Sequence, residues 1–300
     1  MKGIVLAGGT AKRLYPVTKA CGKSLLPLYD KPLVYYPLSV LLRAGIRDIL
    51  IIVPAGLVTP FADLFADGSA FGVSITYLEQ ETPRGIADAL ILGRDFIGED
   101  RVCLVLGDNI IYGAALDLSL RQAAARQEGA VVFAYPVADP RPFGVIELDA
   151  AGCPLSLEEK PAQPRSHYIV PGIYFYDCQA PQLAASLRPS RRGELEITDL
   201  NRLYLQQGKL QAIPLDRSLG WHDAGTADSL LDAACAVRDA QRSSGKIIAC
   251  LEEIAYHQGW IDTAALQRSG QMLQDAAYGR YLLQLASDRE GKTGKSNICR

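Results

Sequence analysis

A short apolar segment, a pair of glycines and several cations follow one another at the start of the chain. Residues 3–7 (GIVLA) have the composition of a buried strand, and Gly8 and Gly9 come directly after it. Two glycines let the backbone turn sharply and present N–H groups to an anion. Arginine offers phosphate a planar fork and lysine a point charge, and here they follow as Lys12, Arg13 and Lys23. The stretch predicts a phosphate site. A turn with solvated basic residues stays open as the alternative, because neither G-x-G-x-x-G nor G-x-x-x-x-G-K-S/T is matched.

A carboxylate stands at the end of a later apolar segment. Residues 102–106 (VCLVL) read as a buried strand, and Gly107, Asp108 and Asn109 follow it. Ligands of parallel α/β sheets bind beyond the carboxyl ends of the strands, so we expect Asp108 to lie beside the two glycines. A carboxylate in that place could bind Mg²⁺, which prefers oxygen ligands. Taken alone, such an aspartate is more often a loop or helix-cap residue.

Alternating strands and helices must position these residues. Short apolar runs predict strands and longer periodic runs predict helices through the first 135 residues. Continuous apolar strands that alternate with helices indicate a sheet covered on both faces. The prediction is an α/β, Rossmann-like, mostly parallel mixed sheet. Its strands are expected at 3–7, 48–53, 73–78, 102–106 and 130–135, and its helices at 33–44, 60–66, 86–96 and 116–128.

After about residue 136 the chain has a different pattern. Shorter, mixed strands are expected at 143–148, 153–158, 172–176 and 210–214, with helices at 179–187 and 196–207. We interpret this part as an insertion layer for substrate recognition, built onto the same sheet. A helix at 228–241 and helical periodicity over 252–283 predict a small C-terminal helical subdomain. Residues 287–300 are polar, contain Gly291 and Gly294, and are predicted to be disordered.

Composition excludes several classes of partner. The chain has 31 Lys and Arg against 33 Asp and Glu, so no overall field attracts nucleic acid or an acidic membrane. Its seven cysteines are scattered without the spacing of metal ligands or a redox pair, which indicates a reducing compartment. No signal peptide is evident, and no apolar run approaches the ~20 residues of a membrane helix. We therefore expect a cytoplasmic protein that binds neither nucleic acid nor membrane.

Six motifs in order carry a family resemblance. They are LAGGTAKRL at 6–14, KSLLPLYDKPLVYYPL at 23–38, LGDN at 106–109, SLEEKP at 156–161, RGELEITD at 192–199 and WHDAGT at 221–226. Together they resemble the sugar-1-phosphate nucleotidyltransferases, most closely the glucose-1-phosphate thymidylyltransferases. The resemblance covers residues 2 to about 283.

This resemblance implies an activity. Members transfer a nucleoside monophosphate from dTTP to glucose 1-phosphate and release dTDP-glucose and pyrophosphate, by one Mg²⁺-dependent in-line displacement at the α-phosphorus. The product serves deoxysugar and polysaccharide synthesis, and the enzymes are commonly homotetramers. Three alternatives remain open: UTP or another hexose 1-phosphate as substrate, a catalytically weak regulatory homologue, and, more weakly, a dinucleotide-binding oxidoreductase.

The resemblance also implies roles for individual residues. A catalytic domain would span 1–240, with nucleotide binding in about 1–136 and sugar-phosphate binding in about 137–240, followed by the helical subdomain at 241–286. The catalytic cations would be Arg13, Lys23 and Lys160. The nucleotide would meet Leu6, Gly8, Gly9, Thr10, Ala11, Lys12, Gln80, Gly85 and Asp108. The sugar phosphate would meet Gly144, Glu159, Lys160, Gly172, Tyr174 and Arg192. Asp108 and Asp223 would hold Mg²⁺.

Two segments bear on specificity and on departures from the family. The Q-x-x-P-x-G pattern from Gln80 to Gly85 would recognise the edge of a pyrimidine and separate thymine from uracil only weakly, by about 1 kcal/mol for one methyl group. Ala11 and Lys12 replace the usual glycine and threonine of the loop. If that loop position has a positive φ, Ala11 costs about 1 kcal/mol. Arg84 stands where aspartate is common, and Pro171 where threonine is common.

Overall fold

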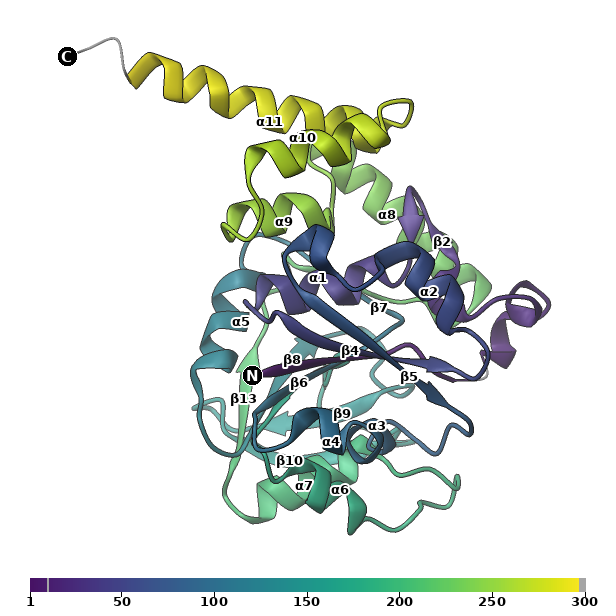
Figure 1. The fold of residues 1–300 in the computed structure, drawn as a ribbon. Helices are drawn as coiled ribbons and strands as arrows, with labels where there is room; N and C mark the ends of the chain where they lie inside the picture. Colours follow the sequence, from purple (N-terminus) through teal and green to yellow (C-terminus); the bar gives the residue numbers. More distant parts are fainter. Residues whose placement is uncertain (10, 297–300) are drawn as a thin grey trace.

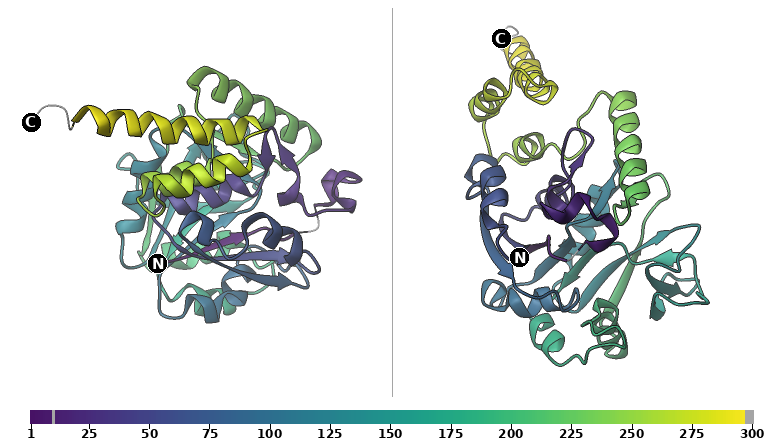
Figure 2. Two further views of the ribbon diagram at one scale, coloured as in Figure 1. Left: turned by 45° about the horizontal axis from the view of Figure 1, so that its top comes forward. Right: turned by 90° about the vertical axis from the view of Figure 1, so that its right-hand side faces the viewer.

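The computed structural model describes residues 1–9 and 11–296, with side chains described up to residue 288. A ten-stranded mixed sheet forms its centre, in the order β10-β9-β11-β8-β12-β6-β1-β4-β5, with β13 paired to β8. Helices cover both faces of this sheet, and a helical subdomain stands at the C-terminal end (Figures 1 and 2). The predicted fold class is therefore confirmed.

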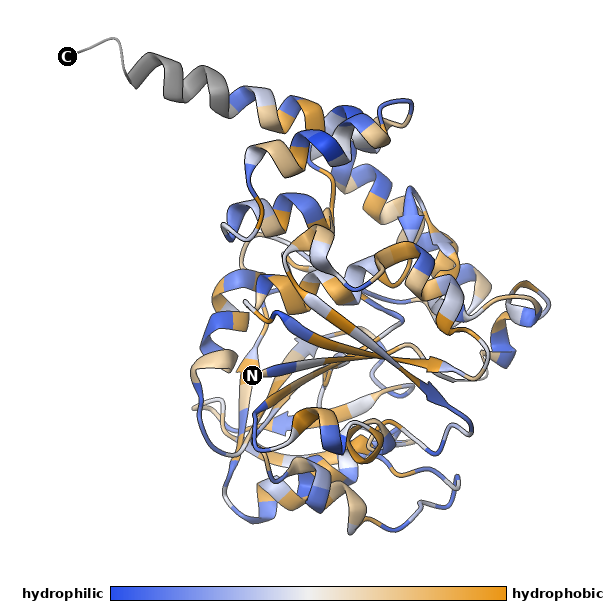
Figure 3. Cartoon of the chain, in the orientation of Figure 1, coloured by the Kyte–Doolittle hydropathy of each residue, from blue (hydrophilic) through white to orange (hydrophobic). Residues whose placement is uncertain are grey.

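The parallel part of the sheet comes from the first third of the chain. It consists of β1 (Lys2–Leu6), β4 (Asp48–Pro54), β5 (Ser74–Gln80) and β6 (Val102–Leu106). In register, Ile4 lies between Leu50 of β4 and Leu104 of β6. These apolar strands are the orange stretches that cross the centre of Figure 3. All four predicted strands are found here, with ends that shift by one or two residues.

Alternate side chains of these strands enter two separate cores. Val5 and Ile51 pack with α1 (Tyr35–Arg43), α2 (Val58–Phe65) and α5 (Leu116–Ala125) on one face. Ile4 and Leu50 pack with α3 (Asp88–Leu92), α4 (Arg94–Ile97), α6 (Ala180–Ala185) and α7 (Ile197–Gln206) on the other. Strand side chains alternate between the two faces, so both faces must be covered.

The helix predicted over 86–96 is divided into α3 and α4. Gly93 lies between them, and a Cβ atom there would approach Ile4 Cδ1 to 2.8 Å and the Ala89 carbonyl to 3.1 Å. The missing side chain therefore lets the turn between the helices pack directly on the central strand β1.

The chain from residue 130 onward extends the same sheet through antiparallel pairings. These are β8 (Ala130–Pro136), β9 (Gly144–Leu148), β10 (Pro154–Glu159), β11 (Tyr168–Ile169) and β12 (Ile173–Tyr176). β12 lies between β6 and β8 and is antiparallel to both. Only β13 (Leu210–Pro214) pairs with β8 in parallel. The insertion is thus continuous with the nucleotide half.

Five short strands among the described residues were not predicted from the sequence: β11, described above, and the four strands that form two small ribbons. β7 (Asn109–Tyr112) and β14 (Gly220–Asp223) pair antiparallel in a separate ribbon, with Asp223 opposite Asn109. Gly220 permits this pairing, because a Cβ atom there would lie 2.3 Å from Cζ of Tyr112. A second small ribbon joins β2 (Pro27–Leu28) to β3 (Lys31–Pro32). Each strand is too short to show period-two alternation in sequence.

The C-terminal part is helical, as predicted. α8 (Ala227–Ser244) begins with a capping box between Thr226 and Ser229, and α9 (Leu251–His257), α10 (Thr263–Met272) and α11 (Ala277–Ser296) follow. The expected disorder from residue 287 differs from the structure, in which α11 continues to Ser296. Residues 297–300 lie outside the described part. No helix of the described residues is long and apolar enough to cross a membrane.

Candidate active site

Two cavities lie side by side along the carboxyl edge of the parallel strands. One has a volume of about 360 Å³ and the other about 340 Å³. Ile86, Leu106 and Asp108 line both. The first is also lined by Leu6, Gly8, Gly9, Lys23, Gln80, Gly85 and Glu194. The second is also lined by Arg13, Gly144, Glu159, Lys160, Gly172, Tyr174, Trp221 and Asp223. Hence the residues assigned to nucleotide and to sugar phosphate fall largely into separate, adjoining cavities.

The glycine loop forms the floor of the first cavity. Gly9 has φ 102°, a conformation that side-chain-bearing residues rarely adopt. A Cβ atom on Gly8 would lie 2.4 Å from Oε1 of Gln80, and one on Gly107 would lie 2.8 Å from Cα of Ala7. Glycine at these positions lets the loop approach both Gln80 and the end of β6. Thr10, also assigned to the nucleotide, lies outside the described residues.

Ala11 adopts the strained conformation considered from the sequence. Its φ and ψ are 44° and 33°, in the left-handed region, and its carbonyl accepts a 2.9 Å hydrogen bond from Oγ1 of Thr18. It lines a third cavity, of about 220 Å³, with Gly9, Cys21 and Lys23. Lys12 follows as an exposed residue in a short 3₁₀ helix. The loop therefore keeps a glycine-like backbone without the glycine.

A glycine at position 11 should stabilise the fold. Ala11→Gly removes left-handed strain of about 1–2 kcal/mol and adds unfolded-state entropy of about 0.4–1 kcal/mol, so we expect the free energy of unfolding to rise by about 0.5–1 kcal/mol. Urea denaturation measures it. The matched control is Ala20→Gly, at an exposed residue with φ −105°, which should lower the same quantity. A loss of stability in Ala11→Gly comparable to that control would contradict the assignment of strain.

Two aspartates from distant segments meet where the cavities join. Asp108 follows β6 directly, and the pairing of β14 with β7 brings Asp223 beside it, with the Ala224 N–H donating to the Asp108 carbonyl at 3.2 Å. Burial and the nearby Asp108 carboxylate raise the pKa of Asp223, while Lys23, Arg13 and Lys160 act in the opposite direction. Two carboxylates and three cations thus share one electrostatic environment.

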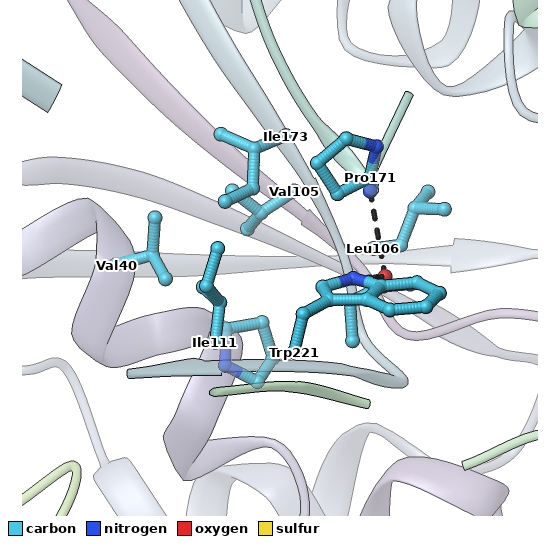
Figure 4. Close-up of a pocket in the computed structure, with 10 residues that line it drawn as sticks. Val40, Val105, Leu106, Ile111, Pro171, Ile173 and Trp221 are labelled. Carbon is cyan, nitrogen blue, oxygen red and sulfur yellow. Dashed lines mark hydrogen bonds between the residues drawn. The ribbon is translucent and has the colours of Figure 1, made fainter. Parts of the chain in front are cut away.

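Hydrogen bonds fix the Asp108 carboxylate. Lys23 Nζ donates to Oδ2 at 2.5 Å and Asn109 Nδ2 donates to Oδ1 at 3.1 Å. Asn109 is held in turn by Trp221, whose Nε1 donates to its Oδ1 at 2.9 Å. In Figure 4 the Trp221 indole lies beneath Leu106 and Pro171 and beside Ile111. This packing restrains the orientation of Asp108. Neither Asn109 nor Trp221 was assigned a role from the sequence.

A hydrogen-bond acceptor, Glu159, and a cation, Lys160, lie together at one end of the second cavity. Glu159 ends β10, and its Oε2 accepts a 2.5 Å hydrogen bond from Oγ1 of Thr198 in the first turn of α7. Lys160 follows with a positive φ of 45°, and its Nζ lies 3.8 Å from Oε1 of Glu159. Tyr174 forms part of the wall, and burial raises the pKa of its hydroxyl. This end of the cavity can bind hydroxyl groups and an anion together.

Arg192 is surrounded by carboxylates. Its guanidinium lies 3.3 Å from Glu159, 2.5 Å from Glu194 and 3.8 Å from Glu196. Glu194 also lines the first cavity. The family resemblance implied that Arg192 binds the sugar phosphate, but it did not indicate this set of partners. A phosphate that binds Arg192 would therefore compete with these glutamates for its guanidinium.

The loop at residues 80–85, which was predicted to recognise the base, is attached to the same segment. Gly85 has φ 114°, and a Cβ atom there would lie 2.4 Å from the Leu195 carbonyl. The Leu195 N–H donates to the Arg84 carbonyl at 2.6 Å, and the Ala87 N–H donates to the Leu195 carbonyl at 3.2 Å. Backbone hydrogen bonds therefore tie the loop at residues 84–87 to the segment that carries Glu194.

Comparison with known proteins assigns the family. The family model described as nucleotidyl transferase matches residues 2–240. The chain belongs to the nucleotidyl transferase family. It is 51% identical over 285 residues to a glucose-1-phosphate thymidylyltransferase of Neisseria meningitidis, covering 95% of this chain and 99% of that one. A relative of the same name from Mycolicibacterium smegmatis is 50% identical over 290 residues, or 97% and 100% of the two chains. The resemblance predicted from the motifs is confirmed.

Solved structures of nucleotidyl transferase relatives have the same fold. A protein from Bacillus anthracis, solved in complex with sucrose, is 42% identical with a TM-score of 0.74, over 80% of this chain and 96% of that chain. A UDP-glucose pyrophosphorylase complexed with UDP-glucose has a TM-score of 0.71 at 22% identity, over 80% and 98% of the two chains. The latter likeness concerns the fold alone.

Proposed function

We propose that this nucleotidyl transferase is an enzyme that makes dTDP-glucose and pyrophosphate from dTTP and glucose 1-phosphate. The observation that carries the proposal is the pair of adjoining cavities that share Asp108. One combines a glycine loop with a buried glutamine, and the other combines Glu159 with Lys160. The names of the relatives at about half identity over nearly the full chain support the choice of substrates.

In the proposed reaction a phosphate oxygen of glucose 1-phosphate attacks the α-phosphorus of dTTP. The bond to the β-phosphate breaks, and pyrophosphate leaves in line. Lys23 would neutralise the triphosphate from the first cavity, and Arg13 and Lys160 the attacking phosphate from the second. Glu159 would accept hydrogen bonds from sugar hydroxyls, and Arg192 would exchange a glutamate for the phosphate. Such transfer depends on positioning and charge neutralisation rather than on a protein nucleophile.

The two aspartates fit a magnesium ion. Among the described residues no group of three or more His, Cys, Asp or Glu side chains could hold a metal, but Mg²⁺ is usually bound by one or two carboxylates plus waters and substrate phosphate. Burial, followed by the nearby Asp108 carboxylate, raises the pKa of Asp223, and a cation bound between the two carboxylates would favour their ionised forms. When bound, Mg²⁺ would supply charge neutralisation at the phosphates.

A release assay for pyrophosphate tests the function. The purified protein would be supplied with dTTP, UTP, CTP, ATP or GTP, each with glucose 1-phosphate or another hexose 1-phosphate, in the presence of Mg²⁺. We expect the highest kcat/KM with dTTP and glucose 1-phosphate. Binding of dTDP-glucose without turnover of any pair would instead support a regulatory homologue.

We also propose a homotetramer in a reducing, cytoplasmic compartment. Among the described residues the cysteines are all free thiols. The tetramer is proposed from the resemblance to the thymidylyltransferases, and Met272 and Leu273 at the end of α10, 78% and 44% exposed, could contact another copy. Light scattering coupled to gel filtration would give the mass, and a monomer at micromolar concentration would contradict the tetramer.

A further inference from the structure

A buried carboxylate controls the side chain expected to recognise the base. Gln80 ends β5, lines the first cavity and is 5% exposed. Its Nε2 donates to Oδ2 of Asp88 at 3.1 Å. Asp88 begins α3, is 1% exposed, and accepts a 2.7 Å hydrogen bond on Oδ1 from Nη2 of Arg84. Three side chains thus form a chain of contacts that ends in the cavity.

The chemistry of this contact fixes which way the amide points. A glutamine amide has a donor side and an acceptor side, and turning it by 180° exchanges them. An ionised carboxylate can only accept hydrogen bonds, so the NH₂ group of Gln80 must face Asp88. The carbonyl Oε1 then lies on the other side, against Gly8 of the glycine loop, where a Cβ atom would come within 2.4 Å of it.

We propose that Asp88 is a specificity-determining positioning residue, which selects pyrimidines that carry a proton on N3. Thymine and uracil donate a hydrogen bond from N3, whereas N3 of cytosine is an acceptor. When the carbonyl of Gln80 faces the base, it can accept a hydrogen bond from N3 of thymine or uracil. The same carbonyl repels N3 of cytosine, because both atoms are acceptors. The inference rests on the proposed function, since it assumes that this cavity receives the base of a pyrimidine triphosphate.

Arg84 holds Asp88 in place for this contact. Burying a carboxylate without a charged, hydrogen-bonded partner is costly. Nη2 of Arg84 donates to Oδ1 of Asp88, which leaves Oδ2 to accept from Gln80. Arg84, whose side chain is 57% exposed, supplies the compensating charge from the solvent side of the cavity. Arg84 stands where aspartate is common in the family, and its contact with Asp88 gives this replacement a physical role.

Asp88→Asn tests the proposal with little change of shape. An asparagine can accept or donate, so Gln80 could pair with it in either orientation. We would measure kcat/KM for dTTP, dUTP and dCTP with glucose 1-phosphate. The preference of the native protein for dTTP over dCTP, about 100-fold or more, should fall at least about tenfold. The ratio of dTTP to dUTP, which depends on one methyl group, should stay within about twofold. The matched control is Asp95→Asn, at an exposed carboxylate of α4, which should change neither ratio.

The outcomes separate the two hypotheses. If the native protein fails to prefer pyrimidine triphosphates, the proposed function is wrong. If it prefers dTTP but a folded Asp88→Asn variant keeps the native ratio of dTTP to dCTP, the role of Asp88 is wrong. Should Asp88→Asn fail to fold, judged by its thermal unfolding, Arg84→Gln decides. It should lower the ratio in the same direction, and an unchanged ratio would overturn the inference.

Discussion

Asp223→Asn should lower the rate of pyrophosphate release by about two to four orders of magnitude. The substitution removes one of two proposed magnesium ligands, and metal stabilisation of charge at a phosphoryl group is worth several kcal/mol, where about 1.4 kcal/mol is tenfold in rate. Asp108→Asn should have an effect of the same size. Initial rates at saturating Mg²⁺ measure the loss. Near-native turnover in either variant would remove that residue from the metal site.

The same substitution should not weaken the fold. Burial and the Asp108 carboxylate raise the pKa of Asp223 in the folded protein. At a pH above that raised pKa, the charged Asp223 carboxylate therefore lowers the free energy of unfolding. Asparagine carries no charge, and in a metal-free buffer at pH 7 Asp223→Asn should be as stable as the native protein or more stable. The difference should shrink as the pH falls through the raised pKa, because native Asp223 then gains its proton. Thermal unfolding in a chelator measures this.

A nearby carboxylate provides the matched control for these measurements. Asp228 lies in the first turn of α8, five residues after Asp223, and is exposed. Asp228→Asn removes the same charge without touching either cavity, so both turnover and stability should stay close to native values. A loss of rate in this variant would show that net charge, rather than ligand loss, explains the effect at Asp223.

The nucleotide half of the fold could be predicted because its signals are local. Residues 48–54 and 102–106 are almost entirely apolar, so their burial as central strands requires no knowledge of distant partners. Gly8 and Gly9 directly follow such a strand, which places them at its carboxyl end. The sequence also predicted that Ala11 would be strained if its position had a positive φ, and the structure gives it a φ of 44°.

The parts that could not be predicted depend on contacts across long stretches of chain. Asp223 approaches Asp108 only because two four-residue strands, more than a hundred residues apart, pair with each other. Asn109 and Trp221 meet through that pairing, and neither residue type indicates a role by itself. Asp88 reads as an ordinary residue of a helix start, and its contact with Gln80 becomes visible only when the loop between them is folded. Family resemblance located Asp223 without supplying this physical cause.

Lys160→Gln should lower kcat/KM for glucose 1-phosphate by about 100- to 1000-fold while changing KM for dTTP by less than about threefold. Lys160 lines the second cavity only, and removing one cation that stabilises developing charge at phosphate costs about this much. The exposed Arg165, which pairs with Glu158 at 3.5 Å, is the matched control. Arg165→Gln removes a cation five residues away, and both kinetic constants should stay native.

A second substitution at position 160 separates lost charge from lost conformation. Lys160 has a positive φ of 45°, a conformation that costs a side-chain-bearing residue about 1–2 kcal/mol. Lys160→Gly relieves that strain, so it should be more stable to urea than Lys160→Gln and yet equally impaired toward glucose 1-phosphate. If the glycine variant instead recovered most of the native kcat/KM, the backbone of this turn, and not the ammonium group, would be what the sugar phosphate requires. A rise in KM for dTTP equal to that for glucose 1-phosphate would place Lys160 between both substrates rather than in the second cavity.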